Sequence, residues 1–167
     1  MERNLPKRKT TRLREYDYGE AGAYFLTLCT ENRKNILSKI VGAGSSRPQL
    51  LLNGAVVEKW IKRIPQKYNG VFVDNYVIMP NHIHLLLSIV KSDGRENPSP
   101  TISQVVGWLK YQVTKEIDES STLKGKKIFQ RSFFDHIIRG YKDYKETYDY
   151  IEENPIKWEL DKLYNEK

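Results

Sequence analysis

Alternating apolar and polar residues mark the strands that this 167-residue chain is expected to form. Three segments have the alternation and the aromatic and β-branched residues typical of strands: residues 23–30, 71–79 and 82–90. The last two are separated by Pro80 and Asn81, so we expect them to be antiparallel neighbours. Residues 128–139 form a further strand or extended segment, which Gly140 closes.

Apolar residues at steps of three and four predict two helices that each bury one face. The first begins at Asn53, which can cap it, and runs to about Tyr68. The second begins at Thr101 or Ser103 and runs to about Glu119. The apolar faces are Val56, Val57, Trp60, Ile61 and Ile64 in the first helix, and Ile102, Val105, Val106, Leu109, Val113 and Ile117 in the second.

A third helix is expected after Gly140, with a stripe of large side chains turned toward the core. That stripe consists of Tyr141, Tyr144, Tyr148 and Ile151. Pro155 interrupts the pattern, because proline lacks the N–H group and disfavours helix at the preceding residue. A short terminal helix is expected to restart at this proline, with apolar residues Trp158, Leu160 and Leu163.

The order of these elements predicts an α+β fold, a ferredoxin-like antiparallel sheet with helices packed on its faces. Residues 38–52 contain several glycines and serines and should form a loop or hairpin, and residues 91–100 form a polar loop. Residues 18–167 are expected to form a single domain. Residues 1–17 are expected to form a separate basic arm.

Composition and charge narrow the class of protein. No apolar run approaches membrane-spanning length, no signal peptide is visible, and Cys29 is the single cysteine. One cysteine excludes an intrachain disulfide and fits a reducing compartment, so we expect a soluble cytoplasmic protein with no membrane partner. We interpret Cys29 as a small strand residue. The net charge of +7, concentrated in the arm that contains Arg12 and Arg14, favours nucleic acid as a partner.

Two of the three histidines, His82 and His84, lie on one predicted strand. Residues two apart on a strand share a face, so both imidazoles can reach one metal ion. The alternate residues, such as Ile83 and Leu85, fall on the opposite face and can fill a core. Taken alone, this pair is as well explained by packing as by metal binding.

Among the eleven tyrosines, helical geometry singles out Tyr150. At about 100° per residue, Tyr150 lies well away from the centre of the predicted core stripe, and Asn154 is one turn later on its own face. A tyrosine displaced from the core face is suited to presenting its hydroxyl group. Tyr111 is the competing candidate, because it too lies opposite its helix's apolar face.

Three segments in this order resemble the single-tyrosine HUH transposases, and in particular the REP-associated tyrosine transposases. The segments are Asp74-Asn75-Tyr76-Val77-Ile78-Met79-Pro80-Asn81-His82-Ile83-His84, then Phe129-Gln130-Arg131-Ser132-Phe133-Phe134-Asp135-His136-Ile137-Ile138-Arg139, and then Tyr148-Asp149-Tyr150-Ile151 with Asn154-Pro155. The resemblance covers roughly residues 18–164. It implies that residues 18–167 form one HUH transposase-like catalytic domain.

The resemblance implies roles for four residues. His82, His84 and Asn154 would hold a divalent metal, Mg²⁺ or Mn²⁺, and Tyr150 would attack DNA. The implied reaction cuts and rejoins single-stranded DNA near hairpins through a 5′-phosphotyrosine intermediate, with no small-molecule substrate. Some members of the family exchange the tyrosine helix across a homodimer, whereas REP-associated ones can act as monomers, so either state is open here.

The expected DNA contacts lie on polar and basic residues. They are Gln130, Arg131, Arg139, Lys110, Arg12 and Arg14. Trp108 and Tyr111 are further candidates for stacking on unpaired bases, although Trp108 is equally well explained by packing. For His136 we favour a structural hydrogen bond over catalysis.

Three alternatives remain in view. The fold could serve a non-cleaving nucleic-acid-binding domain, although the four intact site residues argue against it. A zinc hydrolase would need a third strong ligand, and neither Cys29 nor His136 has diagnostic spacing. A replication initiator or relaxase of the wider HUH group commonly has a longer chain.

Overall fold

The computed structural model describes residues 21–42, 47–90, 99–120 and 125–165. The basic N-terminal arm, with Arg12 and Arg14, lies outside the described residues, and so does most of the polar loop at 91–100. Among the described helices, none is long and apolar enough to cross a membrane.

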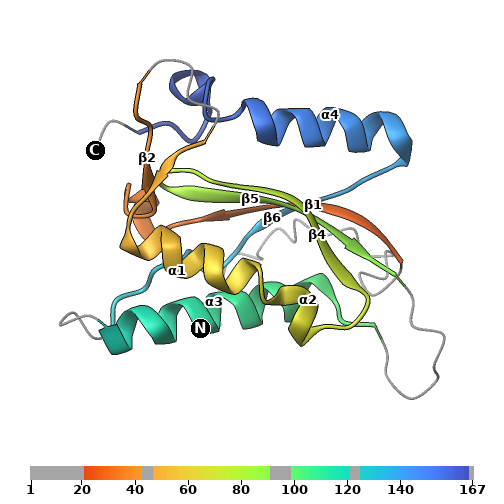
Figure 1. Ribbon diagram of the computed structural model, residues 1–167, viewed down its shortest axis with the longest axis horizontal. Coiled ribbons are helices and arrows are strands. Elements are labelled where there is room, and N and C mark those ends of the chain that lie inside the picture. The colour runs from red at the N-terminus through yellow and green to blue at the C-terminus, as the bar shows by residue number, and fades with distance from the viewer. Residues whose placement is uncertain (1–20, 43–46, 91–98, 121–124, 166–167) are drawn as a thin grey trace, which may run out of the picture.

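Four antiparallel strands form the central sheet, in the order β4-β5-β1-β6 (Figure 1). They are β1 (Gly22–Cys29), β4 (Val71–Ile78), β5 (His82–Ile89) and β6 (Phe134–Ile137). With one helical segment between β1 and β4 and another between β5 and β6, this order is the β-α-β-β-α-β arrangement of the ferredoxin-like fold. The predicted fold class and the antiparallel pairing of β4 with β5 are confirmed.

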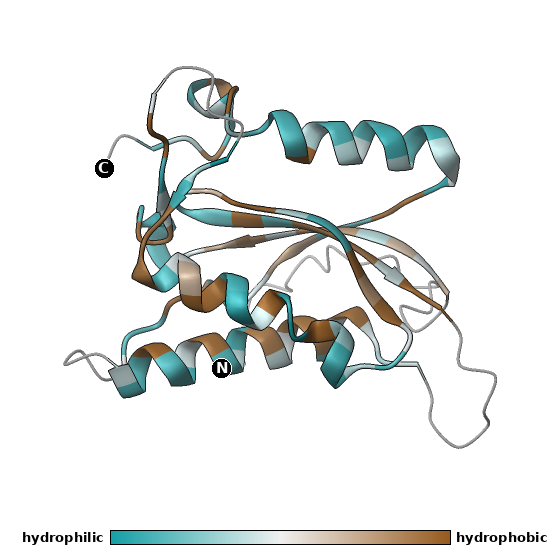
Figure 2. Ribbon diagram, viewed as in Figure 1, coloured by the Kyte–Doolittle hydropathy of each residue, from teal (hydrophilic) through white to brown (hydrophobic). Residues whose placement is uncertain are grey.

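Helices cover both faces of the sheet, but unequally. Figure 1 shows α1 (Leu52–Ile61), α2 (Ile64–Lys67) and α3 (Ile102–Ser120) over one face and α4 (Gly140–Glu153) over the other. Hydrophobic residues of α1 and α3 face the sheet, whereas α4 is largely hydrophilic (Figure 2). The helix that carries Tyr150 is therefore held by a much smaller apolar contact than the helices opposite.

Alternation along β5 divides its side chains between these two faces. Ile83, Leu85 and Leu87 are fully buried in the large core under α1 and α3. Leu86 points to the other side, into a small cluster with Ile151 of α4 and with Trp158. His82 and His84 share the face of Leu86, so the sheet presents both imidazoles to α4.

The predicted first helix is interrupted near Pro65. The residues form α1 and α2 instead of one helix, because Pro65 has no N–H to donate to the Ile61 carbonyl. Asn53 is not the cap, since Leu51 occupies the N-cap position. Gly54 is required at the start of α1 by a close approach, because an added Cβ would come within 2.0 Å of the Leu37 carbonyl oxygen.

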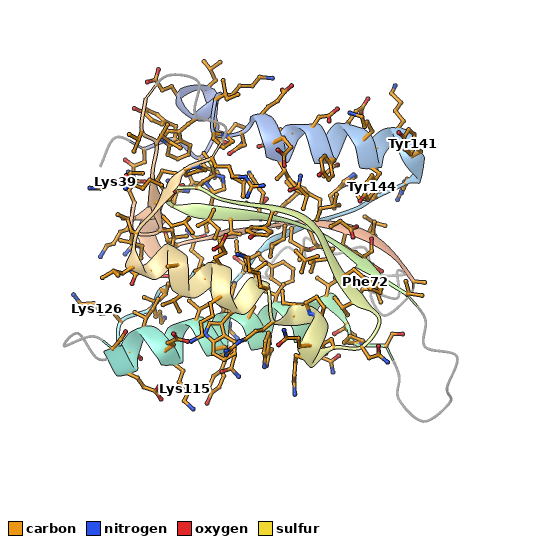
Figure 3. The ribbon with its side chains drawn as sticks, viewed as in Figure 1. Lys39, Phe72, Lys115, Lys126, Tyr141 and Tyr144 are labelled. Atoms are coloured by element: carbon orange, nitrogen blue, oxygen red, sulfur yellow. The ribbon has the colours of Figure 1, made fainter. Side chains whose placement is uncertain are left out.

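The predicted core stripe of α4 was partly right, because Ile151 and Tyr144 pack in the cluster with Leu86, whereas Tyr141 and Tyr148 do not. The buried residues are Thr147 and Ile151, while Tyr141 at the start of the helix is 80% exposed (Figure 3) and Tyr148 is 37% exposed. At about 100° per residue, Tyr150 therefore lies beside the buried line rather than opposite it. This position on the helix brings the Tyr150 ring close to the sheet face that carries His82 and His84.

Of the two remaining segments, the hairpin has the predicted form and the C-terminal helix is shorter than predicted. Residues 38–52 contain the hairpin of β2 (Ser38–Lys39) and β3 (Gln49–Leu50), as predicted. Two single 3-10 turns complete the elements, η1 (Glu31–Arg33) and η2 (Trp158–Leu160). The latter replaces the expected terminal α-helix, and its Leu160 is 85% exposed.

Candidate active site

The histidine pair lies at the start of the inner strand β5, on the face of the sheet under α4. His82 and His84 stand opposite Cys29 and Thr27 of β1 and are 0% and 2% exposed. Their Nε2 atoms are 3.1 Å apart. The sequence prediction that both side chains converge on one point is therefore correct.

Asn81 fixes the tautomer of His82. Its Nδ2 group donates to the Leu163 carbonyl oxygen at 2.8 Å, which orients the amide so that its Oδ1 atom faces His82 Nδ1, also at 2.8 Å. Since an amide oxygen only accepts hydrogen bonds, Nδ1 carries the proton and Nε2 of His82 keeps its lone pair. A hydrogen-bonded Nδ1 of this kind is the usual support for a metal-binding imidazole.

His84 is supported in a similar way by Thr27. The Thr27 hydroxyl and His84 Nδ1 are 2.9 Å apart in a buried position. Burial lowers the pKa of His82 to about 4, and burial followed by the neighbouring His82 lowers the pKa of His84 well below its ordinary value. Both imidazoles are therefore neutral at pH 7, the protonation state that binds metal.

Tyr150 reaches this pair from α4. Its hydroxyl oxygen lies 3.5 Å from His84 Nε2, and its ring makes an edge contact with Phe25 at 5.9 Å between centroids. Tyr150 as a whole is 46% exposed. Burial, followed by the charge of Asp161, raises the pKa of the phenol.

Asn154 lies one turn beyond Tyr150 and is 3% exposed. Its Nδ2 group donates to Asp161 Oδ2 at 2.8 Å. Its Oδ1 atom is buried and has no hydrogen-bond partner among the described residues. A buried amide oxygen without a partner, on a side chain that is bonded to Asp161, is a natural oxygen ligand for a cation.

Asp161 was missed by the sequence analysis. One of its carboxylate oxygens and one ring nitrogen each from His82 and His84 all lie within 4.8 Å of one another. The same carboxylate is 3.5 Å from the Tyr150 hydroxyl. Asp161 follows the 3-10 turn η2 in an irregular segment far along the chain from the histidines, so no periodicity or motif pointed to it.

The assembled donors fit a divalent metal ion. Two imidazole nitrogens, one carboxylate and one unpaired amide oxygen make a mixed nitrogen and oxygen set, which suits Mn²⁺ and accommodates Mg²⁺ less readily. The structure thus brings His82 and His84 together with Asp161, which joins the candidate ligands, and the metal role of these residues stays a prediction.

A groove of about 770 Å³ opens from Tyr150 and His84 toward the edge strand β6. Gln130 lines this groove, whereas Arg131 and Arg139 are exposed residues at the two ends of the β6 segment. Lys110 projects from α3, and its ammonium donates to the carbonyl oxygens of Gln130 and Ser132 at 2.8 and 3.1 Å.

The other aromatic and histidine candidates lie outside this centre. Tyr111, 62% exposed, is on α3 across the sheet from α4. Trp108 packs against Trp60 and Tyr68, as its packing interpretation predicted. His136 bonds Asp143 at 3.0 Å, which is the structural role expected for it and which ties β6 to the start of α4.

Comparison with known proteins identifies the family of the chain. The sequence profile of the family described as "Transposase IS200 like" matches residues 20–154. An uncharacterised protein of Haemophilus influenzae is 33% identical, covering 94% of this chain and 93% of that protein. A REP-associated tyrosine transposase of Escherichia coli K12 is 26% identical, covering 84% and 70%.

A solved structure shares the fold. It is the REP-associated tyrosine transposase bound to a REP hairpin, with a TM-score of 0.63, 22% sequence identity and coverage of 92% of this chain and 77% of that one. The likeness shows that the two proteins share one fold.

Proposed function

The chain belongs to the IS200-like transposase family and is a transposase, and we propose that it cuts and rejoins single-stranded DNA through a phosphotyrosine formed on Tyr150. The observation that carries this proposal is the position of the Tyr150 hydroxyl, 3.5 Å from both His84 Nε2 and Asp161 Oδ2. A phenol this close to candidate metal donors, on a residue that is 46% exposed, supports the proposal.

In the proposed reaction, the Tyr150 oxygen attacks the phosphorus of a phosphodiester. The new bond joins the tyrosine oxygen to the 5′-phosphate, and the bond from phosphorus to the 3′ oxygen breaks. The phenol gives up its proton to solvent, and the leaving oxygen takes one up to become a free 3′-OH. The ester retains the energy of the broken linkage, so a 3′-OH can attack the phosphotyrosine and restore a DNA strand without ATP.

The chain's own groups would prepare this step. His82, His84, Asp161 and the Oδ1 atom of Asn154 would hold Mn²⁺ or Mg²⁺, which when bound supplies Lewis-acid polarisation of the scissile phosphate. The Asp161 carboxylate, 3.5 Å from the phenol, would orient its hydroxyl group. Burial and Asp161 raise the pKa of Tyr150 in the protein alone, so the phenol is protonated at neutral pH before the reaction.

Hairpin DNA is the proposed partner, on the ground that the structural relative is bound to one. Gln130 would contact the strand within the groove, with Arg131 and Arg139 outside it and Arg12 and Arg14 contributing from the arm. Lys110 would contribute to DNA binding indirectly, by holding the backbone of Gln130 and Ser132 in place. We expect the protein to act in the cytoplasm, as a monomer or as a homodimer that exchanges α4.

A denaturing gel tests the proposal directly. The protein is incubated with labelled single-stranded hairpin oligonucleotides, including ones from the flanks of its own gene, and Mn²⁺ or Mg²⁺. We expect a covalent adduct that is lost in Tyr150→Phe and retained in Tyr111→Phe, its control. An adduct that persists in Tyr150→Phe refutes the nucleophile, and hairpin binding without any adduct favours the non-cleaving DNA-binding alternative.

A further inference from the structure

One large aromatic side chain in the active-site groove is left exposed. Phe134 is 57% exposed, although most large apolar residues of the sheet are buried. It lines the same groove as Tyr150 and Phe25. Isolated apolar residues on a surface need no explanation, but an exposed ring inside a groove that leads to a nucleophile is a candidate contact for the substrate.

Strand register places Phe134 in line with the proposed metal donors. Phe134 of β6 stands opposite Thr27 of β1, and Thr27 stands opposite His84 of β5. All three side chains therefore share the face under α4. Neighbouring strands are about 4.8 Å apart, so Phe134 lies roughly 10 Å from His84, toward the edge of the sheet.

The backbone that leads into Phe134 is held in place. The Lys110 ammonium, which comes from α3 across the sheet, donates to the carbonyl oxygens of Gln130 and Ser132. It also lies 5.6 Å from the centroid of the Phe133 ring. A surface fixed in this way loses little freedom when it binds a ligand, which favours affinity.

The groove combines the aromatic rings of Phe134 and Phe25 with cationic and polar groups. Lys157 and Lys162 line it near Tyr150, and Gln130 and Ser132 line it near Phe134. Lys157 is paired with Glu153, whereas no ion pair is described for the exposed Lys162. Aromatic faces beside lysines form the usual surface for single-stranded nucleic acid, where bases stack and phosphates meet positive charge.

We propose that Phe134 is the stacking platform for an unpaired nucleobase next to the scissile phosphate. This inference rests on the proposed function and names a part of the substrate. The ring would stack on a base of the single strand that leaves the hairpin, while Tyr150 takes the neighbouring phosphate. Because every base has a π-face, the platform holds the strand without selecting its sequence.

Binding measurements separate this role from a structural one. In a Tyr150→Phe background with Mn²⁺, which keeps the DNA intact, affinity for a fluorescent hairpin with a single-stranded extension is measured by anisotropy. Phe134→Ala is expected to weaken binding roughly 5- to 150-fold, whereas Phe134→Trp retains it. Thermal melting accompanies each variant, and Phe134→Leu keeps the apolar volume while removing the aromatic face.

The chain offers a matched control in Phe72. It is 51% exposed and lies on β4, the opposite edge strand of the same sheet (Figure 3), outside the lining of the groove. Phe72→Ala should leave hairpin affinity unchanged. Equal losses in Phe72→Ala and Phe134→Ala would overturn the proposal, as would full affinity in Phe134→Ala or in Phe134→Leu.

An abasic scan then identifies the stacked base. Each nucleotide of the single-stranded extension is replaced in turn by an abasic residue. The resulting loss of affinity is measured for the protein with Phe134 and for Phe134→Ala. At one position the penalties should fail to add, because the same contact is removed twice. Additive penalties at every position contradict the inference. Wild-type protein that forms no adduct with any hairpin instead contradicts the proposed function, so the two failures are distinguishable.

Discussion

The two faces of the central sheet bury different kinds of side chain. On the face under α1 and α3, strand β5 buries Ile83, Leu85 and Leu87 among apolar neighbours. On the face under α4 the same strand buries two imidazoles, beside a small apolar cluster. A single alternating strand thus provides the stable core on one side and polar groups, which are costly to bury, on the other.

The difference explains why the polar face can exist. Imidazoles held neutral by burial need hydrogen-bond partners, and Asn81 and Thr27 provide them. The apolar face holds the strand in position, so that these bonds need not stabilise the fold themselves. Substitutions on the two faces should therefore have different consequences, activity on one and stability on the other.

The largest expected effect is on the α4 face. Tyr150→Phe should abolish the covalent DNA adduct completely, because no hydroxyl remains to attack phosphorus. The free energy of unfolding should change by less than about 0.5 kcal/mol, since Tyr150 is half exposed. The adduct gel measures the loss of activity, and denaturant unfolding measures the stability. A large loss of stability would contradict the separation of the two faces.

On the opposite face, Leu85→Ala should lower the free energy of unfolding by about 2–5 kcal/mol. Leu85 is fully buried, so its removal leaves a cavity among packed neighbours. Urea titration measures the loss. The adduct formed per folded molecule should stay near the wild-type level, and a variant that is stable but inactive would show that the two faces are not separable.

A smaller effect is expected where a polar group supports a proposed ligand. Thr27→Val keeps the shape of the side chain but removes the oxygen 2.9 Å from His84 Nδ1. Loss of such a support should weaken Mn²⁺ binding about 10- to 100-fold, measured by calorimetry or by the paramagnetic resonance of free Mn²⁺. Unchanged Mn²⁺ affinity would remove Thr27 from the site.

The smallest effect concerns Lys110, which connects the two faces. Burial lowers the pKa of its ammonium to about 8, so between about pH 8 and its ordinary 10.5 the unfolded chain holds more protons than the folded one. Stability contributed by this group therefore rises with pH across that window.

Lys110→Met should remove this rise, by about 1 kcal/mol after allowance for partial solvent screening. Unfolding of both proteins at pH 8 and pH 10 measures it as a difference, which cancels the titration of other lysines and tyrosines. Parallel pH profiles for the two proteins would contradict the assignment.

The parts of the site that follow local periodicity could be predicted from the sequence. His82 and His84 face one way because a strand alternates, and the apolar face of α3 follows from a pattern that every turn repeats. Pro65 was an available signal for the break between α1 and α2, since proline cannot continue the hydrogen bonds of a helix. These features depend on a few neighbouring residues.

The rest depended on contacts between distant segments. Tyrosine is apolar enough for a core and polar enough for a surface, so Tyr141 and Tyr148 were placed in the core wrongly, whereas Tyr144 does pack there. Asp161 reaches the histidines because its segment folds back over the sheet, and no local pattern in the sequence encodes that return. The choice of Tyr150 over Tyr111 as the nucleophile stays a prediction, although Tyr150 is the one of the two that lies beside His84.

The Asn81 amide has a consequence beyond orienting one imidazole. It also holds the Leu163 carbonyl, and the Leu163 N–H donates to Asp161, so the segment after η2 and the histidine pair share one network of hydrogen bonds. Cation binding and docking of the C-terminal segment would be coupled through this network. By thermodynamic linkage, each then changes the equilibrium of the other by the same factor. A cation that tightens the C-terminal segment against the sheet would, to the same degree, be bound more tightly because that segment is docked.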